Sequence, residues 1–421
     1  MMLLDSAHIA YRGRRLFVED CALDDLAARF GTPLYVYSRA AMQAALAGYQ
    51  RALDGRDALI CYALKANSNL AVLQTFARAG CGFDIVSGGE LERVIAAGGD
   101  PAKVVFSGVG KTRAEMRQAL AAGVMCFNVE SVAELEVLSQ VAAAEGTTAR
   151  VSLRVNPDVD ARTHPYISTG LKGNKFGIAH DEALAAYRHA ASLPGLAVTG
   201  IDFHIGSQIT AVEPYRDALD RMLDLVEGIE AQGIELHHLD LGGGLGICYT
   251  DEQPPSAEAL VRALLARIDE RGHGKRRIVL EPGRSLVGNA GVLVSEVLYL
   301  KPSAARNFCI VDAAMNDLVR PAMYEAWMAI VATTLRDAPA RNWDVVGPVC
   351  ESGDWLGRDR LLAVEAGDFV AVLSAGAYAM SMASNYNSRG RAAEVMVSQA
   401  DARLIRDRER AADLFRGEHL L

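Results

Sequence analysis

The sequence is poor in the features that mark secreted and membrane proteins. Its seven cysteines are odd in number and widely spaced, and no CxxC pair occurs, so neither a disulfide framework nor a zinc cluster is indicated. No apolar run approaches the roughly 18 residues that a membrane span needs. The first residues, MMLLDSAHIAYRGRR, lack the pattern of a signal peptide. We therefore expect a protein of the cytoplasm.

Basic charge is also scarce. The 43 Lys and Arg residues stand against 52 Asp and Glu residues, which gives a formal net charge of −9. Because strong binding to phosphate backbones usually needs a basic face, this balance argues against nucleic acid as a partner. The chain has 421 residues, of which 51% are hydrophobic and 23% charged, as is typical of a globular protein. Its length predicts more than one core.

A repeating pattern of strand and helix begins near residue 58. Two helices between the strands start with the spacing of a capping box, Thr112 with Glu115 and Ser131 with Glu134. Strands are predicted at 58–64, 82–87, 103–107, 124–129, 150–156, 196–204, 236–241 and 277–282. Because parallel neighbours need a crossover, the alternation predicts parallel pairing. Eight such units favour a (β/α)₈ TIM-like barrel, with a doubly wound open sheet as the alternative.

The pattern changes after residue 285. The remaining chain contains short strands separated by turns, for example at 307–313, 343–350 and 368–376, which predicts a mostly antiparallel β domain. The predicted domains are therefore an N-terminal segment, 1–33, that joins the β domain, a barrel at 34–285, and the β domain itself at 286–421. The charged stretch ADARLIRDRERAADLF predicts a terminal helix.

Polar residues lie just past the predicted barrel strands, where a parallel barrel places its active site. Lys65 follows the first strand, and an amine held in an apolar mouth loses its proton more readily and can attack a carbonyl to form a Schiff base. The alternative is an ordinary surface lysine. At or past the other strands come Asp84, Arg154, Asn156, His204, Ser207, Gly242–Gly244, Glu281, Gly283 and Arg284.

The glycine run 242–244 leaves main-chain amides open to a phosphate. In (β/α)₈ enzymes the phosphate site often follows strands seven and eight, so Gly283 and Ser207 are candidates to complete a cradle. Taken alone, the run is equally typical of a tight structural turn. A cradle together with a Schiff-base lysine indicates pyridoxal 5'-phosphate (PLP). Glu281 is then a candidate partner of the pyridine nitrogen, and His204 is a candidate to stack on the ring.

Seven motifs, in this order, closely resemble those of the diaminopimelate decarboxylases. They are YALKAN, HIGSQ, DLGGGLG, EPGR, MNDLVRPAMY, GPVCESGD and GAYAMSMASNYNSR. This family belongs to the fold-type III PLP enzymes, which include ornithine and arginine decarboxylases and alanine racemase. The resemblance covers about residues 10–395, and HPYISTGLKGNKFGI, RPAMY and CESGD are its most specific parts.

The resemblance implies an activity and a set of cofactor residues. Members of the family use PLP to decarboxylate meso-2,6-diaminopimelate to L-lysine and carbon dioxide, the last step of lysine biosynthesis. Lys65 would bind the cofactor as a Schiff base and Glu281 would pair with the pyridine nitrogen. The implied cofactor site consists of Lys65, Asp84, His204, Ser207, Gly243, Gly244, Glu281, Gly283, Arg284 and Tyr378.

The far end of such a substrate carries both a carboxylate and an ammonium group. Arg320 and Arg284 offer planar forks that suit a carboxylate, Glu351 offers the opposite charge, and Tyr324 and Tyr378 add hydroxyls. Lysine and ornithine lack the distal carboxylate, so buried arginines would reject them. Taken singly, an arginine or a glutamate here is better explained by a surface ion pair.

Cys350 is the candidate general acid, because a neutral thiol can protonate the carbon that has lost carbon dioxide. The common alternative for a free cysteine is a small buried hydrophobic residue. In the family, residues at the positions of Cys350 and Glu351 reach the cofactor of the neighbouring subunit. The resemblance therefore implies a homodimer with shared active sites.

Other interpretations stay open at this point. A related decarboxylase acting on ornithine, arginine or carboxynorspermidine is the main alternative. A racemase needs a second base, for which the sequence offers no candidate. An inactive regulatory relative is expected to lack Lys65 or Cys350, and both are present. A barrel hydrolase with two catalytic carboxylates gives no reason for Lys65 beside a glycine cradle.

Overall fold

The computed structural model describes residues 7–160, 169–170 and 174–421. The chain forms two compact units. The β unit consists of Met1–Ala44, Ile247–Glu252 and Leu286–Leu421, and the barrel unit consists of Ala45–Gly246 and Gln253–Ser285. Part of the HPYISTGLKGNKFGI motif lies outside the described residues.

The barrel unit is built on a closed parallel sheet. Its strands are β5 (Ala58–Ala63), β6 (Gly82–Ile85), β7 (Val104–Phe106), β8 (Cys126–Val129), β9 (Ala149–Asn156), β11 (Leu196–Asp202), β12 (His238–Asp240) and β13 (Arg277–Leu280). Each pairs with the next, and β13 pairs with β5 to close the ring. A short strand, β10 (Ile178–Ala179), adds to β9. The predicted TIM-like barrel is confirmed, since all eight strands overlap the predicted ranges.

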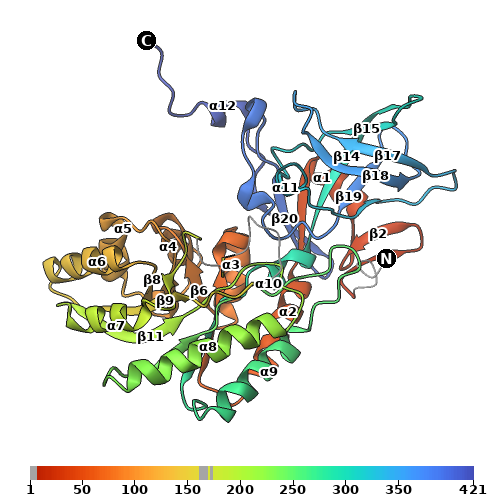
Figure 1. Cartoon of the computed structure of the whole chain (residues 1–421). Helices are drawn as coiled ribbons and strands as arrows, with labels where there is room; N and C mark the ends of the chain where they lie inside the picture. The colour runs from red at the N-terminus through yellow and green to blue at the C-terminus, as the bar shows by residue number, and fades with distance from the viewer. Residues whose placement is uncertain (1–6, 161–168, 171–173) are drawn as a thin grey trace. The chain divides into compact units, whose positions relative to one another are not determined.

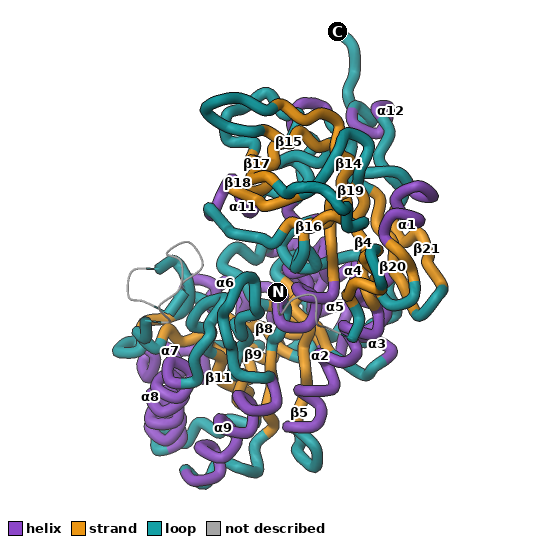
Figure 2. Tube along the Cα trace, turned by 90° about the vertical axis from the view of Figure 1, so that its right-hand side faces the viewer, coloured by secondary structure: helices purple, strands orange, loops and turns teal. Residues whose placement is uncertain are grey.

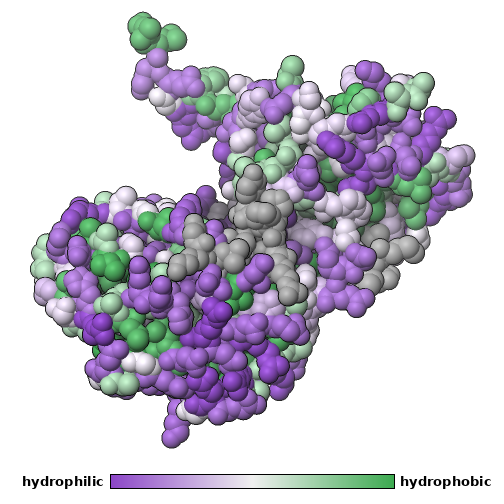
Figure 3. All heavy atoms as spheres, in the orientation of Figure 1, coloured by the Kyte–Doolittle hydropathy of each residue, from purple (hydrophilic) through white to green (hydrophobic). Residues whose placement is uncertain are grey.

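Helices alternate with these strands and surround the sheet (Figure 1). They are α2 (Arg39–Ala52), α3 (Leu70–Arg78), α4 (Gly88–Ala96), α5 (Arg113–Ala122), α6 (Val132–Ala144), α7 (Ala183–Ser192), α8 (Glu213–Glu230) and α9 (Ala257–Glu270). The surface over α8 and α9 is predominantly hydrophilic (Figure 3), as expected for helices that turn their apolar side to a sheet. Thr112 and Glu115 form the predicted capping box. Ser131 caps α6, but the Glu134 carboxylate bonds to the Glu130 N–H instead of completing a box.

The barrel interior is divided into an apolar and a polar part. Inward-facing side chains lie two residues apart along each strand. Leu59, Cys61, Val105, Cys126 and Val279 form an apolar cluster. Further along the strands, toward their carboxyl ends, the buried inward positions are polar: Asp84, Asn128, Ser152, Arg154, Asp202 and Asp240. The polar layer therefore leads to the end of the barrel where the candidate site lies.

The β unit contains a mostly antiparallel sheet, whose strands are drawn in orange in Figure 2. Its strands are β4 (Leu34–Ser38), β14 (Gly291–Lys301), β15 (Phe308–Val311), β16 (Ile330–Ala332), β17 (Arg341–Val346), β18 (Trp355–Leu362), β19 (Phe369–Val372), β20 (Ala393–Ser398) and β21 (Asp401–Arg406). The long strand β14 pairs antiparallel with β4, β15 and β19. Short helices α10 (Arg284–Val287), α11 (Arg320–Tyr324) and α12 (Ala411–Leu414) complete the C-terminal part. The mostly antiparallel β domain is thus confirmed.

The N-terminal residues form a small antiparallel sheet of their own. It comprises β1 (Ile9–Arg12), β2 (Arg15–Val18) and β3 (Cys21–Ala22), followed by α1 (Leu23–Phe30). Side chains of this segment, such as Leu16 and Leu26, share one core with β14 and β20.

Two boundaries differ from the sequence-based expectation. Residues 34–38 were expected in the barrel, but β4 pairs with β14 and β20, and the barrel unit begins at Ala45. All five side chains of β4 are buried, so the local pattern does not indicate which sheet the strand joins. The expected terminal helix is mostly absent, because residues 401–406 form β21 in a hairpin with β20 and only α12 is helical.

Within the described ranges, none of the helices combines the length and the apolarity that crossing a lipid bilayer requires.

Candidate active site

The predicted cofactor residues of the barrel unit lie on one arc of the barrel mouth. The strands β11, β12, β13, β5 and β6 are consecutive neighbours in the ring. His204 and Ser207 follow β11, Gly243 and Gly244 follow β12, Glu281, Gly283 and Arg284 follow β13, Lys65 follows β5, and Asp84 lies in β6. The carboxyl ends of parallel neighbours meet at the same edge, so the fold brings these residues together.

Lys65 is held in a short 3₁₀ turn, Leu64–Ala66, directly after β5. Its Nζ lies 2.5 Å from Oδ2 of Asp84, whose side chain is fully buried, while the Lys65 side chain is 38% exposed. The amine was expected in apolar surroundings, but it has a carboxylate partner, which favours its charged form. Sequence reasoning missed the pairing because the register of β5 against β6 decides it.

The glycine turn after β12 is packed too closely for any side chain at its centre. Gly242 and Gly244 have φ of +64° and +97°. A Cβ at Gly243 would lie 2.1 Å from the carbonyl oxygen of Glu281. The Gly243 N–H donates to Nδ1 of His204 at 3.2 Å, so this nitrogen carries no proton. Burial, and then the charges of Arg154 and Lys65, hold the pKa of His204 well below its usual value, which keeps the ring neutral.

Arg284 supplies a buried cation next to the hydroxyl of Ser207. Its Nε and Nη2 donate to Ser207 Oγ at 3.3 and 3.0 Å. The Arg284 residue is only 4% exposed. A buried guanidinium, a hydroxyl and close-packed glycine backbone at one mouth are groups suited to hold a phosphate.

Glu281 belongs to an acidic cluster that sequence reasoning did not predict. Its carboxylate oxygen, and one oxygen each of Asp202 and Asp240, lie within 4.8 Å of one another, and all three residues are buried. Asn128 Nδ2 donates to both Asp240 and Glu281 at 3.2 Å. Burial and the neighbouring carboxylates Asp240 and Asp84 raise the pKa of Glu281 well above its usual value. A charged residue at an inward position of an apolar strand was the signal available in the sequence.

A further carboxylate outside this cluster, Glu130, connects three segments of the barrel mouth. Its Oε1 accepts hydrogen bonds from the Gly108 N–H and from Nη1 of Arg154, both at 3.1 Å. Its Oε2 accepts the Gly177 N–H at 2.9 Å. Arg154 also lies over the ring of Phe176, 5.0 Å from its centroid. Glu130 therefore joins the segments after β7 and β8 to the residues just before β10.

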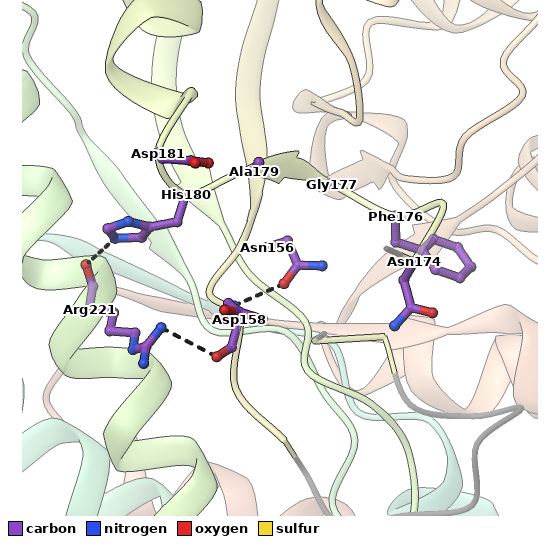
Figure 4. Close-up of a pocket in the computed structure, with 9 residues that line it drawn as sticks. All are labelled: Asn156, Asp158, Asn174, Phe176, Gly177, Ala179, His180, Asp181 and Arg221. Atoms are coloured by element: carbon purple, nitrogen blue, oxygen red, sulfur yellow. Dashed lines mark hydrogen bonds between the residues drawn. The ribbon is translucent and has the colours of Figure 1, made fainter. Parts of the chain in front are cut away.

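A cavity of about 260 Å³ lies beside the end of β9 (Figure 4). His180 bonds to the carbonyl of Arg221, and Arg221 Nη1 donates to the carbonyl of Asp158 at 3.3 Å. Of the polar residues predicted at the barrel mouth, Asn156 is among the described residues that line it, and none of the predicted cofactor or substrate residues is. The lining consists of Asn156, Asp158, Asn174, Phe176, Gly177, Ala179, His180, Asp181 and Arg221.

In the β unit, the predicted substrate residue Arg320 is 7% exposed and opens helix α11. Its guanidinium lies over two aromatic rings, 5.4 Å from the centroid of Tyr249 and 5.7 Å from that of Tyr324. Two ring faces hold the guanidinium plane in a fixed orientation, and a planar fork held in this way suits a bidentate carboxylate. Tyr324 is thus next to Arg320, as its predicted role requires.

Cys350 and Glu351 are exposed at the surface of the β unit. Their loop is held from beneath by Asp354, whose carboxylate accepts the N–H groups of Met315 and Val349 at 2.6 and 2.8 Å. The Cys350 N–H donates to the Asn387 side chain at 3.0 Å. Tyr378 is partly buried, with an unusual φ of +53°.

The residues of the barrel mouth fit PLP. Among the described residues, Glu281 is a buried carboxylate with no ion-pair partner, and the pyridinium nitrogen of the cofactor is a matching cation. Lys65 supplies an amine for its aldehyde. The packed glycines and the Arg284–Ser207 pair suit its phosphate.

Comparison with known proteins agrees with this fit. The sequence profile of the family "Pyridoxal-dependent decarboxylase, pyridoxal binding domain" matches residues 39–288. The chain is 60% identical to the diaminopimelate decarboxylase of Pseudomonas aeruginosa over 98% of this chain and 99% of that one. It is 54% identical to that of Vibrio cholerae over 97% of both. The crystal structure of diaminopimelate decarboxylase from M. jannaschii in complex with L-lysine superposes with a TM-score of 0.95 at 38% identity, covering 100% and 99% of the two chains.

With its barrel, its β unit and its motifs in agreement, the chain belongs to the pyridoxal-dependent decarboxylases and, among them, to the diaminopimelate decarboxylase family.

Proposed function

We propose that this chain decarboxylates meso-2,6-diaminopimelate to L-lysine and carbon dioxide, with PLP as its cofactor. The observation that carries the proposal is the arc of neighbouring strands β12, β13 and β5, which ends in the glycine turn, Glu281 and Lys65. Bound PLP supplies an electron sink that accepts the electron pair left on Cα when the carboxylate departs.

The residues of the barrel unit hold and orient the cofactor. Lys65 supplies the amine that joins its aldehyde, near Asp84, and Glu281 pairs with the ring nitrogen. The neutral ring of His204 stacks on the cofactor, fixed by the Gly243 N–H. The phosphate is held by the remaining predicted residues, which are Ser207, Gly243, Gly244, Gly283 and Arg284. Tyr378 of the β unit is proposed to contact both cofactor and substrate.

Substrate selection rests on the far end of diaminopimelate. Arg320 and Arg284 bind the distal carboxylate, Glu351 binds the distal ammonium, and Tyr324 adds a hydroxyl. The support is the buried guanidinium of Arg320 beside two aromatic rings, a planar fork that suits the carboxylate which only diaminopimelate carries at its far end. This predicts discrimination against ornithine and arginine.

We also propose a homodimer in which Cys350 and Glu351 complete the partner's site, where the Cys350 thiol donates its proton to the carbon that lost carbon dioxide. Cys350 and Glu351 are both exposed, so a neighbouring subunit can contact them. This exposure supports the proposal, because the two side chains would act on a cofactor bound to the other subunit. The free state of all seven cysteines supports a reducing, cytoplasmic location.

The activity is tested by incubating the purified protein with PLP and meso-diaminopimelate and measuring carbon dioxide and lysine. Ornithine, arginine and carboxynorspermidine serve as competing substrates. Faster turnover of any of these overturns the substrate assignment. A protein that stays colourless with added PLP overturns the cofactor assignment and favours an inactive regulatory relative.

Shared sites are tested by mixing two inactive variants, Lys65→Ala and Cys350→Ala, after dissociation and reassociation. Random pairing makes half of the dimers mixed, and each mixed dimer has one intact site of two, so about one quarter of the wild-type activity is expected. A mixture as inactive as its components contradicts shared sites.

A further inference from the structure

The acidic cluster of the barrel interior is not neutralised by cations of the part of the chain that the structure describes. Asp202, Asp240 and Glu281 place oxygens within 4.8 Å of one another, and none of the three exceeds 7% exposure. Among the described residues, none of these carboxylates forms an ion pair. Three ionised carboxylates so close together in a buried site would repel strongly, and each would also lose its hydration.

The two cations whose charges act on the cluster, Arg154 and Lys65, are engaged with other carboxylates. Lys65 lies 2.5 Å from Asp84, and Arg154 lies 3.1 Å from Glu130. Each of these two pairs has a net charge of zero, so neither offsets the charge of the cluster. At least one member of the acidic cluster must therefore hold a proton, and the hydrogen bonds indicate which one.

Asp240 is surrounded by N–H donors. Its Oδ1 accepts the Gly242 N–H at 3.0 Å, and its Oδ2 accepts Nδ2 of Asn128 at 3.2 Å. The same amide group donates to Oε1 of Glu281 at 3.2 Å. Donors of this kind stabilise an ionised carboxylate, so Asp240 is the member best equipped to carry negative charge. The pKa of Glu281 is raised by burial and by Asp240 and Asp84, and its charge is favoured once the pyridinium cation of the cofactor is bound.

Asp202 differs from both Asp240 and Glu281 in its hydrogen bonding. It is 1% exposed, and its Oδ1 has no hydrogen-bond partner among the described residues. It lies directly beside Asp240, because the two are register partners on the adjacent strands β11 and β12. A buried oxygen without a donor is costly in a carboxylate and much less so in a neutral acid.

The other groups around the cluster support this assignment. The pKa of Asp202 is raised well above its usual value by burial and then by the charge of Asp240, and Arg154 opposes this. Burial raises the pKa of Asp240 only to about 6, because its bonds to Gly242 and Asn128 oppose the rise. Other titratable groups act on the cluster from the elements packed around it. They are Cys61 in β5, Lys65 after β5, Asp84 in β6, Cys126 in β8, Glu130 after β8, Arg154 in β9 and Tyr187 in α7.

We propose that Asp202 is held as a neutral carboxylic acid beside Asp240, and that it is a positioning residue for Glu281. With Asp202 neutral, Glu281 meets one charged carboxylate of the cluster instead of two and can present its own charge to the ring nitrogen of the cofactor. The inference rests on the proposed function, because it concerns the form of Glu281 that binds PLP.

The first test is titration of the cofactor-free protein with PLP, followed by visible absorbance. Asn has the shape of a neutral Asp, so Asp202→Asn should bind PLP within about threefold of the wild-type Kd. Asp240→Asn is the matched control. Its side-chain NH2 group must face one of the two N–H donors around Asp240, and two donors cannot bond to each other. This variant and Glu281→Gln should each weaken binding at least about tenfold. An Asp202→Asn variant as weak as Glu281→Gln overturns the proposal.

The second test compares the infrared spectra of the wild-type protein and Asp202→Asn near neutral pH. The wild type should show the C=O stretch of protonated carboxyl groups, with and without PLP, and Asp202→Asn should show a weaker band, since Glu90, whose pKa burial raises to about 7, also contributes. If the wild-type protein binds PLP but the two bands are equal, the inference about Asp202 alone is overturned. A wild-type protein that binds no PLP contradicts the proposed function instead.

Discussion

Substituting Gly243 tests whether the close approach of the ends of β12 and β13 determines the geometry of the cofactor site. In Gly243→Ala, the new Cβ would lie 2.1 Å from the carbonyl oxygen and 2.9 Å from the carbonyl carbon of Glu281. Real Cβ contacts are essentially never shorter than 3.0 Å, so the oxygen contact must lengthen by about 1 Å. The strain comes from this contact, because the φ of Gly243 is not among the positive values.

The strand ends cannot separate freely. The Glu281 N–H donates to the Gly242 carbonyl at 2.7 Å, and the Leu241 N–H donates to Val279 at 2.9 Å. Overpacking of this kind costs about 1–3 kcal/mol of folding stability. A displacement of about 1 Å in a group that positions a reaction costs about 100-fold in rate. We therefore expect Gly243→Ala to lower kcat about 100-fold, to weaken PLP binding and to lower the unfolding temperature.

Gly110→Ala is the matched control. Gly110 is exposed in the loop after β7, its φ is not positive, and a Cβ there meets no described atom within 4 Å. Its PLP affinity and unfolding temperature should equal those of the wild type. PLP titration of both cofactor-free variants, with thermal unfolding in parallel, decides the matter. Wild-type affinity and stability in Gly243→Ala would refute the reasoning.

Three further predictions follow from the site. Lys65→Ala should fold but form no visible absorbance band with PLP, and a wild-type band in this variant contradicts the assignment of the amine. Arg320→Ala should raise KM for diaminopimelate about 30-fold or more, because an unpaired charged contact costs about 2–5 kcal/mol; Arg262→Ala, at an exposed i,i+4 pair with Glu258, should leave KM unchanged. Because burial depresses the folded-state pKa of His204, the unfolded chain binds a proton that the folded protein excludes, so stability is lost below about pH 6.5. Thermal unfolding between about pH 7 and about pH 5 should therefore fall more steeply for the wild type than for His204→Gln, and parallel slopes would contradict the prediction.

The barrel could be predicted from the sequence because its signals are local. Each strand is a short apolar run, each helix has its own period and cap, and the rule that function follows the carboxyl ends needs only the order of strands. This was sufficient to place Lys65, His204, Glu281 and Gly243 on neighbouring strands. The β domain was recognised for the same reason, from turns and short strands.

The unpredicted features depend on contacts between distant parts of the chain. The Lys65–Asp84 pair and the Asp202–Asp240 neighbours follow from strand register, which a local pattern does not encode. The sheet that β4 joins is decided by partners more than 250 residues away along the chain. The sequence predicts a helix at β21 because this segment is rich in charged residues, and nothing local in it indicates that it pairs with β20.

The pairing of β4 also bears on the order in which the protein is completed during synthesis. This strand leaves the ribosome before the whole barrel, yet both of its neighbours, β14 and β20, are made after it. Until then its two edges are unpaired, and an unpaired apolar edge invites association with other chains. A barrel produced on its own should therefore begin near Ala45, without the strand whose neighbours it would lack.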